Sequence, residues 1–169
     1  MKSNEWEKAA FWQSFFDKGE VAMKRCFFLG HRDAPDNIGA ELEKEIESLI
    51  LESGVVEFMI GNYGRFDTIV QRTLVQLKEK YPHIILTLLL PYHPAVKAAT
   101  LPMGFDQTFY PEEMERVPQR YAIVKANRYA VEHSSHLVAY LRYPGSNTSK
   151  LVEYAKKRQG KGLVEVILL

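Results

Sequence analysis

The sequence predicts an α/β fold, a Rossmann-like three-layer sandwich with a mostly parallel central sheet flanked by helices. Short apolar runs alternate with segments of helical periodicity along the chain, which is typical of a doubly wound sheet. Several of these runs end in glycine-containing loops. The run His83–Leu90 (HIILTLLL) is almost wholly apolar, as expected for a strand buried on both faces of a parallel sheet.

The individual elements follow from this alternation. The expected strands are Cys26–Leu29, Val55–Ile60, His83–Leu90, a short edge strand at Phe105–Tyr110, His136–Leu141 and Leu163–Leu169. The expected helices are Ile38–Ser53, Phe66–Tyr81, Pro118–Ser134 and Lys150–Arg158. Gly54 and Pro82 end the first two of these helices. A proline-rich loop spans Pro91–Pro102.

The chain is predicted to contain one domain, residues 23–169, preceded by a helical extension at residues 1–22. Within the extension, Ser3–Lys18 carries aromatic residues at helical spacing. A length of 169 residues with 46% hydrophobic residues suits a single core. Neither an internal repeat nor a linker divides the pattern.

Composition narrows the possible partners and location. Lys and Arg number 22 against 21 Asp and Glu, a net charge of +1, whereas a duplex-DNA-binding protein usually has a clearly basic balance. A nucleic-acid partner is therefore disfavoured. The single cysteine, Cys26, fits a reducing compartment, and no apolar run reaches the ~20 residues that a bilayer requires. We expect a cytoplasmic protein with no membrane partner, and the sequence leaves a homo-oligomer open.

Three loops follow expected strands at the edge where parallel sheets bind ligands, outside the carboxyl ends of the strands. They contain Gly30-His31-Arg32, the stretch Gly61–Asp67 (GNYGRFD), and Pro144–Ser149 (PGSNTS). One topology would bring all three to the same rim. This convergence predicts a binding site more strongly than any one loop does.

The middle loop has the features of a phosphate site. Gly61 and Gly64 permit close approach to the backbone, and the following helix presents free N–H groups and a positive dipole end. Asp67 could accept a hydrogen bond from a ribose hydroxyl and is the candidate catalytic residue. A tight turn with Asp67 as an ordinary cap remains the alternative. The spacing matches neither the dinucleotide fingerprint nor a P-loop.

The other loops supply further candidates. Gly145, Ser146, Asn147 and Thr148 could wrap a phosphate, or a serine there could simply cap the next helix. Arg32 could bind phosphate or carboxylate, and His31 could stack or hydrogen-bond, with a surface salt bridge as the alternative. Asn127 and Arg128 could reach the same rim if their part of the helix faces it. No catalytic triad order, nucleophile elbow or zinc-ligand spacing is present, and we expect no metal and no cofactor.

Taken together, these motifs resemble the SLOG superfamily. The resemblance lies in a first strand ending in GHR, a second ending in a G-x-x-G-x-F-D loop, a helix with Asn127-Arg128 and a strand leading to a Gly/Ser/Thr loop. That superfamily is Rossmann-like and is related to DprA and to the LOG phosphoribohydrolases. The YpsA-like branch of small bacterial and phage proteins is the most similar. The resemblance covers Lys24 to Leu169.

The resemblance implies a site for a nucleotide or a nucleotide-derived ligand. It would be built from Gly30, His31, Arg32, Gly61, Gly64, Phe66, Asp67, Asn127, Arg128, Gly145, Ser146, Asn147 and Thr148. LOG enzymes cleave the N-glycosidic bond of a nucleoside monophosphate with a PGGxGTxxE motif. Here the loop is PGSNTSKLVE, in which Leu151 stands three residues past Thr148 and Glu153 is two residues too late.

Three functions follow as expectations. The first is a binding protein for a phosphorylated nucleotide derivative, acting as a sensor or signalling module. The second is an N-glycosidic hydrolase, with Asp67 stabilising an oxocarbenium-like transition state and Glu153 in reserve. The third is single-stranded nucleic-acid binding, as in DprA, using stacking aromatics such as Tyr63, Phe66 and Tyr92.

Overall fold

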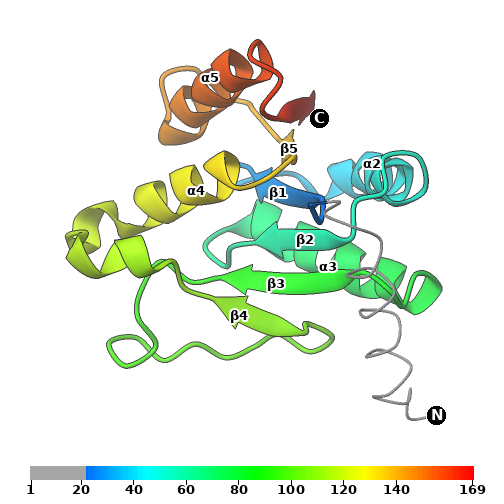
Figure 1. The fold of residues 1–169 in the computed structure, drawn as a ribbon. Coiled ribbons are helices and arrows are strands. Elements are labelled where there is room, and N and C mark those ends of the chain that lie inside the picture. The colour runs from blue at the N-terminus through cyan, green and yellow to red at the C-terminus, as the bar shows by residue number, and fades with distance from the viewer. Residues whose placement is uncertain (1–21) are drawn as a thin grey trace.

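A computed structural model describes residues 22–169 of the chain. The expected helical extension at residues 1–22, including the helix at Ser3–Lys18, lies outside the described residues except for Ala22. The described part is an α/β sandwich with one six-stranded sheet (Figure 1). The predicted fold class is confirmed.

All six strands of the sheet are parallel, in the order β4-β3-β2-β1-β5-β6. They are β1 (Arg25–Leu29), β2 (Glu57–Ile60), β3 (Ile85–Leu89), β4 (Gln107–Phe109), β5 (His136–Ala139) and β6 (Glu165–Leu168). The chain builds outward from β1 through β2 and β3 to the edge strand β4, then returns to pair β5 with the other side of β1. The winding direction therefore reverses between β1 and β5, which is where such sheets open a crevice.

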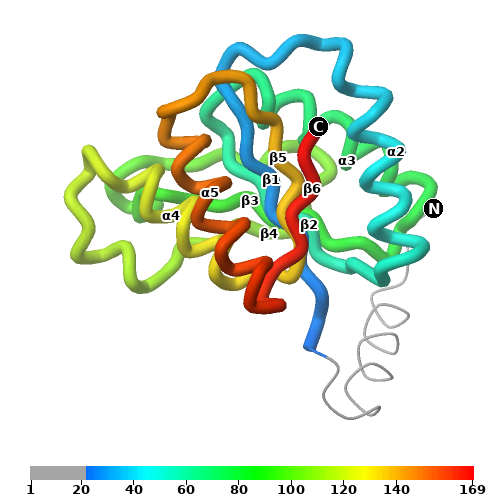
Figure 2. The backbone as a smooth tube through the Cα atoms, turned by 90° about the horizontal axis from the view of Figure 1, so that it is seen from above, coloured from blue at the N-terminus to red at the C-terminus, as the bar shows by residue number. Residues whose placement is uncertain are grey.

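Two pairs of helices cover the sheet. Figure 2 shows α2 (Gly39–Leu51) and α3 (Arg65–Lys80) on one face, with α4 (Ala122–Glu132) and α5 (Asn147–Gln159) on the other. The short 3-10 turns are η1 (Asp36–Ile38), η2 (Glu112–Arg116) and η3 (Gln119–Tyr121). None of the described helices is long and apolar enough to cross a bilayer.

Each helix pair buries its own apolar cluster because side chains alternate between the two faces of every strand. Cys26, Phe28, Phe58 and Ile60 pack under α2 and α3. Phe27, Leu29, Met59 and Leu137 pack under α4 and α5. The periodicity predicted for the first two helices is confirmed, since their predicted apolar faces are buried: Leu42, Ile46, Leu49 and Ile50 in α2, and Phe66, Ile69, Val70, Thr73, Leu74 and Leu77 in α3.

A polar chain crosses four strands on the α4 face. Arg25 Nε donates to Glu57 Oε2 at 2.8 Å, and Thr87 Oγ1 donates to Glu57 Oε1 at 2.9 Å. Gln107 Nε2 in turn donates to Thr87 Oγ1 at 3.1 Å. Glu57 is buried, and a buried carboxylate is tolerated only when it is paired in this way. The chain fixes β1, β2, β3 and β4 against one another.

Two helix starts differ from the prediction by more than one residue. The helix expected from Lys150 begins at Asn147, because Ser146 caps it. The helix expected from Pro118 begins only at Ala122, because Pro118 has a ψ of 139°, outside the helical range, and η3 intervenes. The first difference brings Asn147 and Thr148 into the first turn of α5.

Candidate functional site

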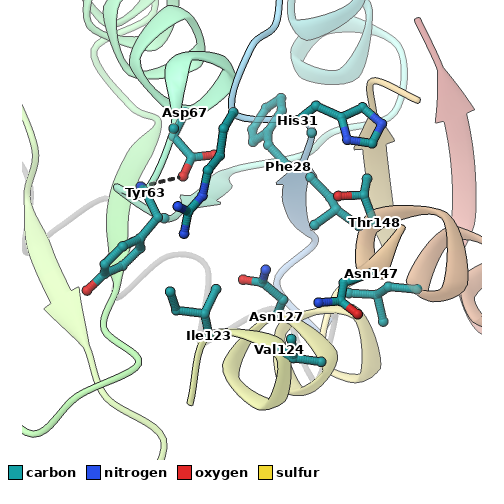
Figure 3. A pocket seen from close by; sticks show the side chains of 15 residues that line it. Phe28, His31, Tyr63, Asp67, Ile123, Val124, Asn127, Asn147 and Thr148 are labelled. Carbon is teal, nitrogen blue, oxygen red and sulfur yellow. Dashed lines mark hydrogen bonds between the residues drawn. The ribbon is translucent and has the colours of Figure 1, made fainter. Parts of the chain in front are cut away.

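A cavity of about 220 Å³ opens at the switch point between the carboxyl ends of β1 and β5. Figure 3 shows Tyr63 and Asp67 on one side, Asn147 and Thr148 on the opposite side, and Asn127 between them on α4. Of the residues predicted from sequence, the lining includes Gly30, His31, Arg32, Gly61, Gly64, Asp67, Asn127, Asn147 and Thr148. The loops after β1 and β2 and the start of α5 therefore do meet at one rim.

Two glycines in the loops after β1 and β2, Gly30 and Gly64, allow other residues of the chain to pack closely against them. A Cβ on Gly64 would lie 2.8 Å from Arg32 Cα, and a Cβ on Gly30 would lie 2.2 Å from the Phe66 ring. Arg65 N–H also donates to Arg32 O at 3.0 Å. The sequence pattern predicted close approach at Gly61 and Gly64. At Gly64 this approach is the packing of the β2–α3 loop against the β1 loop, and Gly30, for which none was predicted, makes similar room for Phe66.

Asp67 is the carboxylate of the cavity. It lies in the first turn of α3, where its Oδ2 accepts the N–H of Tyr63 at 2.8 Å, as the dashed line in Figure 3 marks. Burial raises the pKa of Asp67 to about 6, although the Tyr63 N–H and the nearby charge of Arg32 both act to lower it. The group therefore carries a negative charge at neutral pH in a place that disfavours charge.

Arg32 supplies the positive charge of the cavity. Its side chain is exposed on the rim, and among residues 22–169 no carboxylate lies within 4.0 Å of it. The start of α3 lies beside it, with Gly64 at the N-cap and no side chain capping the helix. A guanidinium outside any ion pair and a helix N-terminus without a side-chain cap both attract an anion.

His31 lines the cavity and also holds two of its loops together through its ring. The ring is buried, and its Nε2 accepts the backbone N–H of Tyr143 at 3.2 Å. Burial lowers the pKa of His31, so the neutral ring is favoured at pH 7. The Tyr143 hydroxyl donates to Asp33 Oδ2 at 2.5 Å. Together these bonds tie the β5–α5 loop to the β1 loop.

Only some residues of the β5–α5 connection line the cavity, and the others form the turn that leads into α5. Gly145 has a φ of 75°, which favours glycine, but it does not line the cavity. Ser146 Oγ accepts the N–H of Ser149 at 3.0 Å and so acts as the N-cap of α5, the alternative that the sequence left open. Asn147 and Thr148 line the cavity with polar groups.

Asn127 and Arg128 point in different directions from α4, and only Asn127 lines the cavity. Asn127 lines the cavity, together with Ile123 and Val124 one turn earlier. Arg128 Nε instead forms an ion pair with Glu132 Oε1 at 3.0 Å. The Arg128 Cζ atom lies over the Tyr154 ring, 4.3 Å from the ring centre. Adjacent residues on a helix point about 100° apart, so both could not face one cavity.

Two further predicted residues lie outside the cavity lining. Phe66 is fully buried under Gly30 and stacks on Tyr140 with ring centroids 6.2 Å apart. Glu153 is exposed on α5. Conversely, five residues that were not predicted from sequence line the cavity: Phe28, Leu29, Ile123, Val124 and Leu151. Tyr63 also lines it, and the sequence predicted Tyr63 only as a stacking aromatic for single-stranded nucleic acid. The signal for Ile123 and Val124 was their spacing of four and three residues from Asn127.

The cavity thus combines one carboxylate, one cation, amide and hydroxyl groups and an apolar wall. Within the described residues there is no cluster of three or more His, Cys, Asp or Glu side chains that could hold a metal ion. No protein-family model matches the chain, and no curated protein is significantly similar to it.

Proposed function

We propose that the chain binds a nucleotide or a nucleotide-derived phosphorylated small molecule in the crevice between β1 and β5. The observation that carries this proposal is the position of Arg32 beside the uncapped start of α3, both on the rim of one cavity. A phosphate bound there would meet a guanidinium and backbone N–H groups together.

The rest of the cavity suits the other parts of a nucleotide. Asp67, which lines the cavity, would accept hydrogen bonds from ribose hydroxyls. Ile123, Val124 and Leu151 form an apolar wall against which a base could pack. Asn127, which carries both donor and acceptor groups, lies beside Ile123 and Val124 on α4 (Figure 3).

Membership of the SLOG superfamily, in its YpsA-like branch, is part of the same proposal. It rests on the GHR and G-x-x-G-x-F-D motifs, whose members Arg32 and Asp67 line the cavity. The fold is of the Rossmann-like type that this membership requires. A sensor or signalling role would follow from binding without turnover.

Isothermal titration calorimetry with the four nucleoside 5′-monophosphates tests the proposal. Arg32→Ala is expected to weaken binding about tenfold or more, because a hydrogen bond to a charged group contributes about 1.5–3 kcal/mol. Asp67→Ala is expected to weaken it as well. Arg128→Ala is the matched control, since Arg128 pairs with Glu132 outside the cavity. Equal affinities in all four proteins, or no binding of wild type to the monophosphates or to the corresponding diphosphates and 3′,5′-bisphosphates, would overturn the proposal.

Hydrolysis of an N-glycosidic bond is the second candidate, favoured by the carboxylate of Asp67. A partly buried carboxylate beside the ribose would stabilise positive charge that develops at the anomeric carbon. Glu153 would not assist, because it is exposed outside the cavity lining. Chromatography of nucleoside monophosphates after incubation with the protein measures directly how much free base is released. Release of free base by wild type, lost in Asp67→Asn, is the expected sign of catalysis, whereas no release leaves binding alone.

A further inference from the structure

A second cavity of about 230 Å³ lies on the other side of Tyr63. Tyr63 lines both cavities, so it forms the wall between them. The second cavity is further lined by Asn62, the end of β3 with Pro91 and Tyr92, and the stretch from Lys97 to Thr100. The loop after β3 therefore continues the rim of the first cavity toward the β4 side of the sheet.

The wall at Tyr63 is held firmly in place. Its backbone N–H is bound by Asp67, as described above. The Gln71 side-chain amide donates to Gly61 O at 2.8 Å and to Asn62 Oδ1 at 3.3 Å. Three consecutive residues of the loop are thus anchored to α3. A ligand in the first cavity would meet a preformed edge at Tyr63.

Lys97 brings a second positive charge to this edge. Its Nζ lies 5.3 Å from the centre of the Tyr63 ring and 5.0 Å from the centre of the Tyr92 ring. These two rings meet edge to face, with centroids 6.2 Å apart. Lys97 N–H donates to His93 O at 3.0 Å, which fixes the backbone turn that carries the side chain. The ammonium is therefore positioned by two aromatic faces.

The charge of Lys97 has no acidic partner among residues 22–169. No acidic residue lines the second cavity, and across the described residues no carboxylate lies within 4.0 Å of the Lys97 ammonium. Aromatic rings attract the cation but accept its N–H groups only weakly, so its three donors stay available. A positioned cation with unused donors is what an anionic group recognises.

We propose that the second cavity binds a second anionic group of the same ligand, held by Lys97 on the far side of Tyr63. This inference rests on the proposed function and narrows it. The ligand would be a nucleotide derivative with two phosphate groups or two separated negative charges, rather than a simple nucleoside monophosphate. Arg32 would serve one anion and Lys97 the other, with Tyr63 between them.

Calorimetry with three probes for each ribonucleoside tests the inference. The probes are the 5′-monophosphate, the 5′-diphosphate and the 3′,5′-bisphosphate, which add the second anion in different places. The proteins are wild type, Lys97→Met and the control Lys125→Met. Lys125 is an exposed residue of α4 that lines neither cavity, so its loss removes the same charge elsewhere.

The inference predicts that at least one two-anion probe binds wild type about tenfold tighter than the matching monophosphate. It also predicts that Lys97→Met abolishes this gain, while Lys125→Met keeps it. The inference fails if no two-anion probe binds more tightly, or if the gain survives in Lys97→Met. In either of those cases, intact monophosphate binding would leave the proposed function standing. Absence of all binding to wild type would overturn both.

Discussion

Replacing Asp67 by asparagine is expected to stabilise the protein at neutral pH and to change its stability little near pH 4. Asparagine keeps an oxygen that can accept the Tyr63 N–H, but it carries no charge. Burial raises the pKa of Asp67 from its ordinary value of 3.8 to about 6. The folded wild-type protein therefore holds a proton that the unfolded chain releases between these two pH values.

The sign and size of the effect follow from linkage. Since the folded state binds the extra proton, the free energy of unfolding of wild type falls as the pH rises through the interval from 3.8 to about 6. A tenfold change in a protonation equilibrium corresponds to about 1.4 kcal/mol, so the full interval corresponds to about 3 kcal/mol. Asp67→Asn has no carboxyl group to titrate at this position, so its free energy of unfolding does not fall in this way. The difference in free energy of unfolding between Asp67→Asn and wild type should therefore grow as the pH rises through the interval and then stay constant.

Urea denaturation at several pH values from 4 to 8 measures this difference. Glu43→Gln is the control, because Glu43 is exposed on α2 and its replacement removes the same charge. A constant difference between Asp67→Asn and wild type at every pH would refute the reasoning, as would an advantage that grows toward acid. A stabilised variant that also loses nucleotide affinity would show that the carboxylate is kept at a cost in stability.

Two substitutions test how the loops are built. Gly64→Ala should destabilise the protein by about 1–3 kcal/mol, because the new Cβ would lie 2.8 Å from Arg32 Cα, whereas the control Gly39→Ala has no atom within 4 Å to meet; equal urea midpoints for the two variants would contradict this. Ser146→Ala should cost about 1 kcal/mol by removing the acceptor for Ser149 N–H while leaving nucleotide affinity intact, since Ser146 does not line the cavity. A loss of affinity without a loss of stability would show that Ser146 binds ligand instead.

The order and face of the elements could be predicted because they depend on local pattern. Apolar spacing alone placed Leu42 and Leu74 on buried helix faces, and the apolar run of β3 indicated a strand covered on both sides. Helix starts were harder, since capping by Ser146 and the turn at Pro118 depend on a single residue's conformation.

The site was predictable to the level of its loops but not of its side chains. The strand-end rule brought the loops of Arg32, Asp67 and Thr148 together without knowledge of their contacts. It could not reveal that Gly64 makes room for Arg32, because that contact joins two loops far apart in sequence. It also could not tell which residue of the Asn127-Arg128 pair faces inward without the rotational phase of α4.

Backbone amide NMR of the labelled protein, titrated with the four nucleoside 5′-monophosphates, tests most directly whether a nucleotide enters the crevice between β1 and β5. Saturable shift changes are expected at the rim, in Arg32, Tyr63 and Thr148, for at least one nucleotide. The amide of Glu165, at the opposite end of the sheet in β6, should not move. No saturable change, or changes gathered around Glu165, would contradict a nucleotide site in this crevice.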